Sequence, residues 1–323
     1  MPRVHLFQQS YSYRHHYLHQ PGFDVFQFLE IAGADGFTGV SINANGANYR
    51  QLSGTTADHF RAVRACLTRL RLRCDLETSD TAPAHMESLL QVGQAVGAEQ
   101  LRTYMRHDGS VSETVARTIA DLRIVARLAE QAGIRVLLEN HEDFTGPELA
   151  SILGAVDNPW IGALYDYGNS MMVGEQPLTA LASILPFVRS AHLKDHVCIA
   201  ADQTPDGRLW VLGTPIGRGH LPIVEITRQL VAGGLDRLIM SSVWAYHAPI
   251  HDHRGDGRIG TGAFAFAKPP FDPVDCPVAA DTLATSDPDR LVALELAAVQ
   301  RGQIWLRHAL ADAGIEIVQR SPD

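Results

Sequence analysis

In VLLENH (residues 136–141), IGALYD (161–166) and VRSAHLKD (188–195), apolar residues lead to a carboxylate or an imidazole at the C-terminal end. Segments of helical character separate these runs, at residues 145–155 and 177–185. Such alternation of strand and helix is typical of a parallel β/α fold. Enzymes with a (β/α)8 barrel carry their functional residues at the C-terminal ends of the strands. This stretch therefore predicts three successive strands of a barrel enzyme, each ending at a candidate site.

The rest of the chain supplies the elements that complete a barrel. Five further runs are expected as strands, at residues 4–9, 39–42, 72–77, 100–104 and 237–242. Helical spacing of apolar residues predicts helices at 24–34, 55–70, 84–96, 112–132 and 221–232. The connection at 196–220 is rich in Gly and Pro, and we expect residues 208–212 within it to form a hairpin arm.

The C-terminal part of the chain reads differently. Residues 243–289 are irregular and rich in proline, and a loop of this length is unusual unless it covers a site or a partner. Residues 290–313 have a strong amphipathic pattern and are expected to serve as the eighth helix. We therefore predict one (β/α)8 TIM barrel domain over residues 1–323, with 245–323 as its C-terminal extension.

Composition excludes several classes of protein. The chain has 323 residues with 46% hydrophobic side chains, which is enough for one large core. A formal charge of −9 argues against nucleic acid as a partner, because phosphate binding needs a basic face. The sequence shows neither a signal-peptide pattern nor an apolar run of the roughly 20 residues that span a bilayer, and its four cysteines lack C-x-x-C spacing. We expect a cytoplasmic protein without a membrane partner, and homo-oligomer formation is left open.

The three strand ends predict a metal site. Side chains alternate between the two faces of a strand, so Glu139 and His141 lie on the same face of their strand. Asp166 and His192 lie near the C-terminal ends of the next two strands, each on one face of its strand. If these faces point into the barrel mouth, Glu139, Asp166 and His192 can meet at one divalent cation. Taken singly, each has a plainer interpretation, since a carboxylate at a strand end is often salt-bridged and a lone histidine is often a core residue. Because three such residues lie at the ends of successive strands, a metal site is favoured.

The same residues resemble a known family. ENH (139–141), DYGN (166–169) and HLKD (192–195) are similar to the strand-end motifs of the sugar phosphate isomerase/epimerase proteins, which form the xylose isomerase-like TIM barrel superfamily. The resemblance covers roughly residues 4–245. It implies that Glu139, Asp166 and His192 are three of four ligands to Mn, Mg, Co or Zn. It does not fix a substrate, because members include epimerases, isomerases, dehydratases and deglycosidases.

One position departs from that pattern. The resemblance implies a fourth ligand, a Glu closing the eighth strand, where this chain reads IMSSVWAY (239–246) with Ser241 in that place. The loss of a carboxylate should weaken metal binding, even to the point of an absent metal, while it leaves an open position and a more Lewis-acidic ion. In the epimerases two metal-side carboxylates move the proton, so Ser241 disfavours simple epimerisation. Glu77, His247 or Asp252 could supply the lost group.

Other residues are candidates for catalysis and substrate binding. Glu139 or His141 could act as the base, and Lys194 could neutralise a developing oxyanion. Arg218 and His220 lie in a GRGH segment (217–220) before a helix, where barrels often bind an anion. Further candidates for contact with the substrate are Arg102 and Tyr104 from the fourth strand, and Trp244 and Tyr246, which could stack on a sugar ring.

The favoured hypothesis is a metal-assisted isomerase or epimerase-like enzyme that acts on a sugar or another polyhydroxylated carbonyl compound by abstracting a proton next to the carbonyl. The first alternative is a lyase that uses one base for dehydration, β-elimination or cleavage of a keto sugar or glycoside. The second alternative is a metal-free sugar-binding or partner protein. The expected partner in each case is a small sugar-like molecule.

Overall fold

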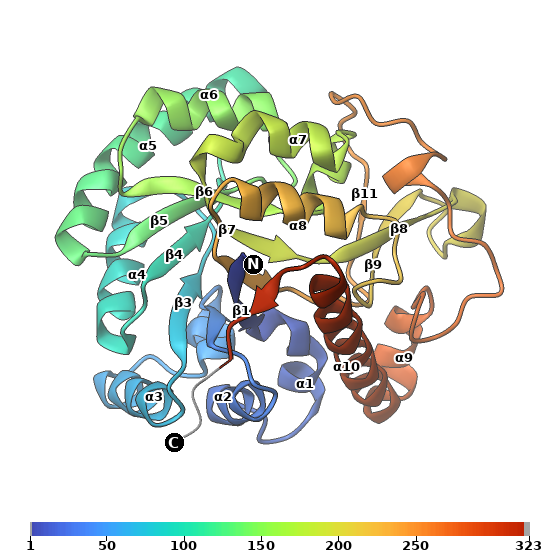
Figure 1. Ribbon diagram of the computed structural model, residues 1–323, viewed down its shortest axis with the longest axis horizontal. Helices are drawn as coiled ribbons and strands as arrows, with labels where there is room; N and C mark the ends of the chain where they lie inside the picture. Colours follow the sequence, from blue (N-terminus) through green and yellow to red (C-terminus); the bar gives the residue numbers. More distant parts are fainter. Residues whose placement is uncertain (1, 320–323) are drawn as a thin grey trace.

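The computed structural model describes residues 2–319, and within them eight parallel strands close into a barrel (Figure 1). Each strand pairs with the next, and β10 pairs with β1, with His5 opposite Arg237 and Gln8 opposite Met240. This confirms the predicted (β/α)8 fold. The barrel strands are β1 (Arg3–Gln9), β2 (Gly39–Asn43), β3 (Arg73–Glu77), β4 (Gln100–Thr103), β5 (Arg135–Glu139), β6 (Ile161–Asp166), β7 (Val188–Leu193) and β10 (Arg237–Met240).

Helices surround the barrel (Figure 1). Their starts are fixed by side chains that cap free N–H groups: Asp24 accepts from the first turn of its helix, and Ser110 and Glu113 form a capping box. Gly133 ends the same helix as that capping box in the left-handed conformation, with φ +68°. The helices that follow successive strands are α2 (Val25–Ala34), α3 (Ala57–Arg69), α4 (Pro83–Val96), α5 (Val111–Ala132), α6 (Gly146–Val156), α7 (Pro177–Ile184) and α8 (Ile223–Ala232).

The barrel interior is filled beneath its C-terminal end. One layer is apolar and consists of Phe7, Leu137, Leu164 and Ile239, all 1% exposed or less. At the N-terminal end, Arg237 donates to both oxygens of Asp75 at 2.6 and 2.7 Å and stacks over the Phe7 ring. Functional side chains at the C-terminal end therefore rest on a packed floor.

Additional elements decorate the C-terminal end of the barrel. The strands β8 (Asp195–Ile199), β9 (Trp210–Thr214) and β11 (His247–Pro249) form an antiparallel sheet, which confirms a hairpin arm near the predicted place. The short helices there are η1 (Ser10–Tyr13), α1 (Arg14–His19), η2 (Ala47–Leu52), η3 (Asn169–Val173), η5 (Ala201–Gln203) and η6 (Gly262–Phe264). The short helix η4 (Leu185–Phe187) directly precedes β7 and lies at the N-terminal end of the barrel.

The C-terminal helix takes the place of the eighth barrel helix. Helix α10 (Pro288–Asp312) begins two residues before the predicted start, because Asp287 caps it and Pro288 fits its first turn. It packs on α1 and on α9 (Ala280–Ser286) (Figure 1). Its buried Glu295 accepts hydrogen bonds from the N–H groups of His15 and His16 and contacts the His16 ring. The last strand, β12 (Glu316–Ile317), pairs with β1.

No helix within residues 2–319 is long and apolar enough to cross a bilayer.

Candidate metal centre and active site

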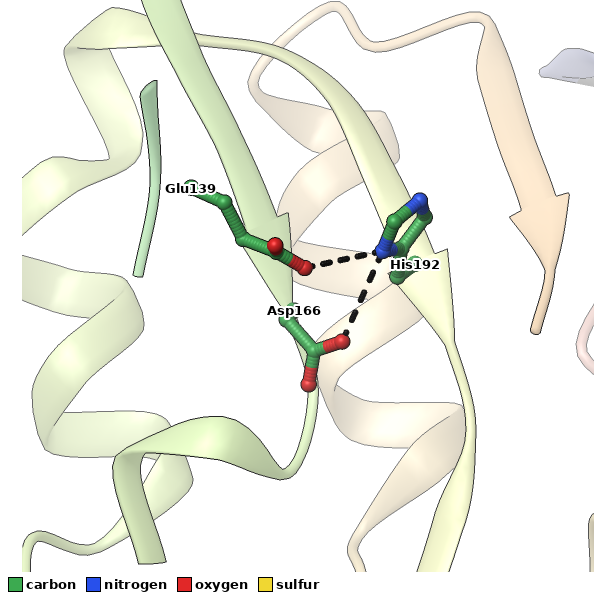
Figure 2. Close-up of side chains that lie close together, drawn as sticks. All are labelled: Glu139, Asp166 and His192. Atoms are coloured by element: carbon green, nitrogen blue, oxygen red, sulfur yellow. Dashed lines mark hydrogen bonds and ion pairs between the residues drawn. The ribbon is translucent and has the colours of Figure 1, made fainter. Parts of the chain in front are cut away.

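Three strands bring one side chain each to a common point at the C-terminal end of the barrel. Glu139 ends β5, Asp166 ends β6, and His192 lies directly opposite Asp166 on β7. Figure 2 shows the three side chains turned toward one another, with His192 Nδ1 2.9 Å from Glu139 Oε1 and 3.6 Å from Asp166 Oδ2. One potential ligand atom from each residue lies within 4.8 Å of the other two. The structure thus brings these residues together in the way that alternation along the strands predicts.

The spacing of these atoms fits a divalent cation. Two ligand atoms that each lie about 2.1 Å from an ion are about 3.0 Å apart at a right angle and about 3.4 Å apart at the tetrahedral angle. The two measured distances to His192 Nδ1, 2.9 and 3.6 Å, lie close to these values. Glu139 Oε2 and Asp166 Oδ2 are also buried without a hydrogen-bond partner, although each faces a cationic side chain. The donor set is therefore suitable for a metal.

The opposite edge of the His192 ring faces another carboxylate. His192 Nε2 lies 2.9 Å from Oε1 of Glu77, which ends β3 and is fully buried. Glu77 also accepts hydrogen bonds from Ser41 Oγ at 2.5 Å and Gln9 Nε2 at 2.7 Å. Burial alone raises the pKa of Glu77, but the charges of Arg102 and His192 and these hydrogen bonds outweigh burial and hold that pKa well below its usual range. Glu77 therefore orients the ring so that Nδ1 faces Glu139 and Asp166.

This geometry bears on the lost fourth ligand. Glu77 lies across the imidazole ring from the convergent group and is not one of the atoms that converge. His247 stacks on Trp210 and contacts Asp281, and Asp252 pairs with Arg254. Among the described residues, none of these three belongs to the convergent group, so the structure does not bring any of them to the place of the missing Glu.

Two buried cations balance the carboxylates. The Arg102 guanidinium lies 3.0 Å from Glu77 and 3.2 Å from Glu139. Lys194 Nζ lies 2.8 Å from Asp166 Oδ2 and donates to Asn169 Oδ1 at 2.9 Å. Although burial opposes it, the carboxylates around His192 raise the pKa of its imidazole to about 10. Three carboxylates thus face three basic side chains, Arg102, Lys194 and His192.

Ser241 directly follows β10 and is 1% exposed. Its hydroxyl donates to Gln9 Oε1 at 2.5 Å, and Gln9 in turn donates to Glu77. Ser241 also lines the cavity above the cluster. A hydrogen-bonded chain from Ser241 through Gln9 to Glu77 therefore stands where the resemblance implies a metal-binding carboxylate.

A polar cavity of about 470 Å³ opens over the cluster, within the size range of small-molecule sites. His141 lines it and stacks on Tyr104, with ring centroids 3.7 Å apart and an interplanar angle of 12°. Burial lowers the pKa of His141, which keeps its imidazole neutral near pH 7. Other lining residues are Gln9, Tyr11, Asn43, Asn45, Arg50, Arg102, Arg106, Glu139, Glu142, Asn169, His192, Lys194, Ser241 and Tyr246.

Three predicted substrate contacts do not reach this cavity. Arg218 is exposed and lies 3.6 Å from Asp275, and His220 Nδ1 contacts the Ala265 carbonyl oxygen. The expected anion site does not form at 217–220, because the buried Asp195 carboxylate already accepts the N–H groups of Gly217, Gly219 and Leu221.

Trp244 also does not line the cavity, although it was predicted to contact the substrate. It is 1% exposed, and its indole N–H donates to the Val274 carbonyl at 2.7 Å. It packs in a cluster with Leu291 and Ala298 of α10, so it belongs to the core that joins the extension to the barrel. Tyr246, the other residue predicted to stack on a sugar ring, does line the cavity, and its hydroxyl donates to Glu142 at 2.6 Å.

Several cavity residues escape detection in the sequence. Gln9 ends β1 and Glu142 lies three residues after the end of β5, and this nearness to a strand end is the only signal that could have found them. Asn169 belongs to the DYGN motif but acts through Lys194, a contact that sequence spacing does not reveal.

Comparison with known proteins places the chain in a family. A family model described as xylose isomerase-like TIM barrel matches residues 29–258. Uncharacterized protein YihM of Escherichia coli (strain K12) is 24% identical over 208 residues, which are 64% of this chain and 63% of that protein. The 3-oxo-isoapionate decarboxylase of Pectobacterium atrosepticum is 24% identical over 148 residues, 46% of this chain and 54% of the enzyme. The chain thus spans less than two thirds of either relative.

Solved structures share the fold. D-psicose 3-epimerase from Clostridium cellulolyticum H10, solved with D-tagatose, aligns with a TM-score of 0.61 at 15% identity over 93% of this chain and 99% of that chain. The IOLI protein, solved with a zinc atom, aligns with a TM-score of 0.57 at 12% identity over 75% of this chain and 90% of that chain. At these identities, the likeness establishes the barrel alone.

Proposed function

Because this chain belongs to the xylose isomerase-like TIM barrel family, we propose that it is an enzyme acting on a sugar or another polyhydroxylated carbonyl compound. The observation that carries the proposal is the convergence of Glu139, Asp166 and His192 beneath a polar cavity of about 470 Å³. The reaction we favour is proton abstraction next to the carbonyl group, as in an isomerase or epimerase. The sugar epimerase among the structural neighbours supports this choice.

Glu139, Asp166 and His192 would hold a divalent cation through two carboxylates and one imidazole nitrogen. Such a donor set suits Mn, Mg, Co or Zn, and a zinc-containing protein shares the fold. When bound, the ion would act as a Lewis acid on the carbonyl group of the substrate. The chain's own residues supply the remaining chemistry.

Lys194 and His141 line the cavity and would supply a cation and a base for this chemistry. Lys194 is a buried cation at the cavity wall, so its ammonium group stabilises negative charge that develops on the carbonyl oxygen. His141 lines the same cavity as a neutral imidazole and accepts the proton. Glu139 is the other candidate base, but contacts with His192 and Arg102 engage its two oxygens.

A lyase is the second candidate. Ser241 leaves the cavity without a second carboxylate on the β10 side, which favours a reaction that needs one base over a two-base epimerisation. Two kinds of relative that cleave bonds also match the chain, the 3-oxo-isoapionate decarboxylase and the inosose dehydratase of Bacillus species.

Solvent deuterium uptake tests the proposal. The purified protein, with Mn²⁺ added, is incubated with a panel of keto sugars in D₂O, and the recovered sugars are analysed by NMR. We expect deuterium at the carbon next to the carbonyl. In His141→Asn the rate of this exchange should fall by a factor of about 10² or more, while metal affinity is retained. Exchange without a new sugar marks abortive proton transfer, and loss of water or of a carbon unit marks a lyase. Absence of both exchange and product across the panel would contradict an enzyme of this class.

A further inference from the structure

The cavity walls differ in charge from the rest of the molecule. Four lining side chains are cationic, Arg50, Arg102, Arg106 and Lys194, whereas two are carboxylates, Glu139 and Glu142. The chain as a whole has a formal charge of −9. The positive wall is therefore a local feature of the cavity, and it does not follow from the composition of the chain.

The cations fall into two groups. Arg102 and Lys194 lie at the deep end, where Glu77, Glu139 and Asp166 balance them. Arg50 and Arg106 lie on the segments that follow β2 and β4, and within residues 2–319 neither has a carboxylate within ion-pair distance. Glu142 offers one opposing charge, but its carboxylate accepts from Tyr246 at 2.6 Å. A divalent cation at the deep end would add to the positive excess.

Tyr104 holds Arg106 in place, and Asp143, which interacts with Arg106 electrostatically, forms no ion pair with it. Arg106 Nη2 donates to the Tyr104 hydroxyl at 2.7 Å, and the guanidinium carbon lies 4.6 Å from the centre of the Tyr104 ring. Tyr104 is itself stacked on His141. An arginine fixed in this way binds an anion with less loss of side-chain freedom than a mobile one.

Arg50 has an unusual backbone. It lies in η2 with φ +34°, a region that residues other than glycine rarely adopt. Gly46, with φ +82°, lies beside the Arg50 guanidinium, which would be in ordinary van der Waals contact, at 3.5 Å, with a Cβ atom at that position. Strained backbone of this kind concentrates at functional sites.

From these observations we infer that the substrate carries an anionic group, a carboxylate or a phosphate, and that Arg50 and Arg106 bind it at the mouth of the cavity. This inference rests on the proposed function and narrows its substrate class to sugar acids or sugar phosphates. The anionic group occupies the outer end of the cavity, and the carbonyl end of the molecule reaches Lys194 and His141. Arg50 and Arg106 are thereby specificity-determining residues.

Three sugars with one carbon skeleton test the inference. They are D-fructose, D-fructose 6-phosphate and D-fructuronate, which carry a hydroxyl, a phosphate and a carboxylate at the same carbon. Binding to the wild-type chain is measured by calorimetry at one fixed salt and Mn²⁺ concentration. We expect at least one charged sugar to bind about tenfold or more tightly than D-fructose, because charge-assisted hydrogen bonds contribute that much. The tighter of the two identifies the anion.

Matched variants complete the test. Arg106→Gln and Arg50→Gln should each weaken binding of the charged sugar about tenfold more than binding of D-fructose. Arg127→Gln removes the same charge from an exposed position on α5 and should change neither. Equal binding of all three sugars, or equal losses in Arg106→Gln and Arg127→Gln, would overturn the anion site while the proposed function stands. If none of the three sugars binds, the proposed function fails together with the inference.

Discussion

Replacing Ser241 with glutamate should tighten metal binding, because the new carboxylate would enter the cavity beside the three convergent side chains. Ser241 lines that cavity, and its only side-chain hydrogen bond within the described residues is to Gln9. A unit charge about 4 Å from a divalent ion gains at most about 8 kcal/mol at an effective dielectric constant of about 20. Desolvation of the carboxylate costs several kcal/mol, and the lost hydrogen bond to Gln9 costs about 1 kcal/mol.

The balance leaves a net gain of roughly 1.4 to 3 kcal/mol, or about a 10- to 100-fold tighter dissociation constant. Calorimetric titration of the chelator-treated protein with Mn²⁺ measures this dissociation constant. Without metal, Ser241→Glu should also unfold at a lower temperature than the wild type, since an additional buried charge is then unbalanced. Ser241→Gln is the matched control, because it adds the same bulk without the charge. Equal Mn²⁺ affinity in the Glu and Gln variants would refute the assignment of Ser241 to the fourth ligand position.

Two further predictions concern stability. Burial, with repulsion from neighbouring carboxylates, raises the pKa of Glu175 from 4.5 to about 7, although the Gly146 N–H donates to it. The native state then holds this proton more tightly than the unfolded state, so stability falls as pH rises from about 4.5 through 7. Glu175→Gln should therefore stabilise the protein more at pH 8 than at pH 4, by up to about 3 kcal/mol in urea unfolding, and an equal effect at both pH values would contradict this. Asp195→Ala leaves the N–H groups of Gly217, Gly219 and Leu221 without their acceptor and should cost at least about 3 kcal/mol. The same substitution should also make residues 215–221 sensitive to limited proteolysis. If the variant resists the protease as well as the wild type does, Asp195 does not anchor this segment.

The part of the site that sequence predicts is the part that barrel geometry dictates. Glu139, Asp166 and His192 end neighbouring parallel strands, and a barrel places such ends on one rim with alternate side chains inward. Their convergence needs no knowledge of rotamers. The amphipathic pattern of 290–313 likewise locates α10, since a long apolar stripe must be buried against another element.

Contacts between distant elements are the part that sequence could not supply. Glu77 contacts Nε2 of His192, 115 residues away in the sequence, because of the rotamer of the His192 ring. This rotamer makes Glu77 a group that orients the ring and not a metal ligand. The GRGH segment has the glycines of an anion-binding loop, but the carboxylate of Asp195, the first residue of β8, accepts the N–H groups of Gly217 and Gly219. Trp244 does not line the cavity because it packs against the C-terminal extension, and no sequence motif shows where that extension lies.

Metal content is the measurement that tests the account most directly. Chelator-treated wild-type protein and Asp166→Asn are each dialysed against Mn²⁺, Co²⁺, Zn²⁺ or Mg²⁺, and bound metal is measured by mass spectrometry, with Asp121→Asn on α5 as the control. We predict about one ion per chain in the wild type and the control, and an affinity lowered about 100-fold or more in Asp166→Asn. A wild-type chain that takes up none of the four ions, or an Asp166→Asn variant that binds as tightly as the control, would contradict the metal centre.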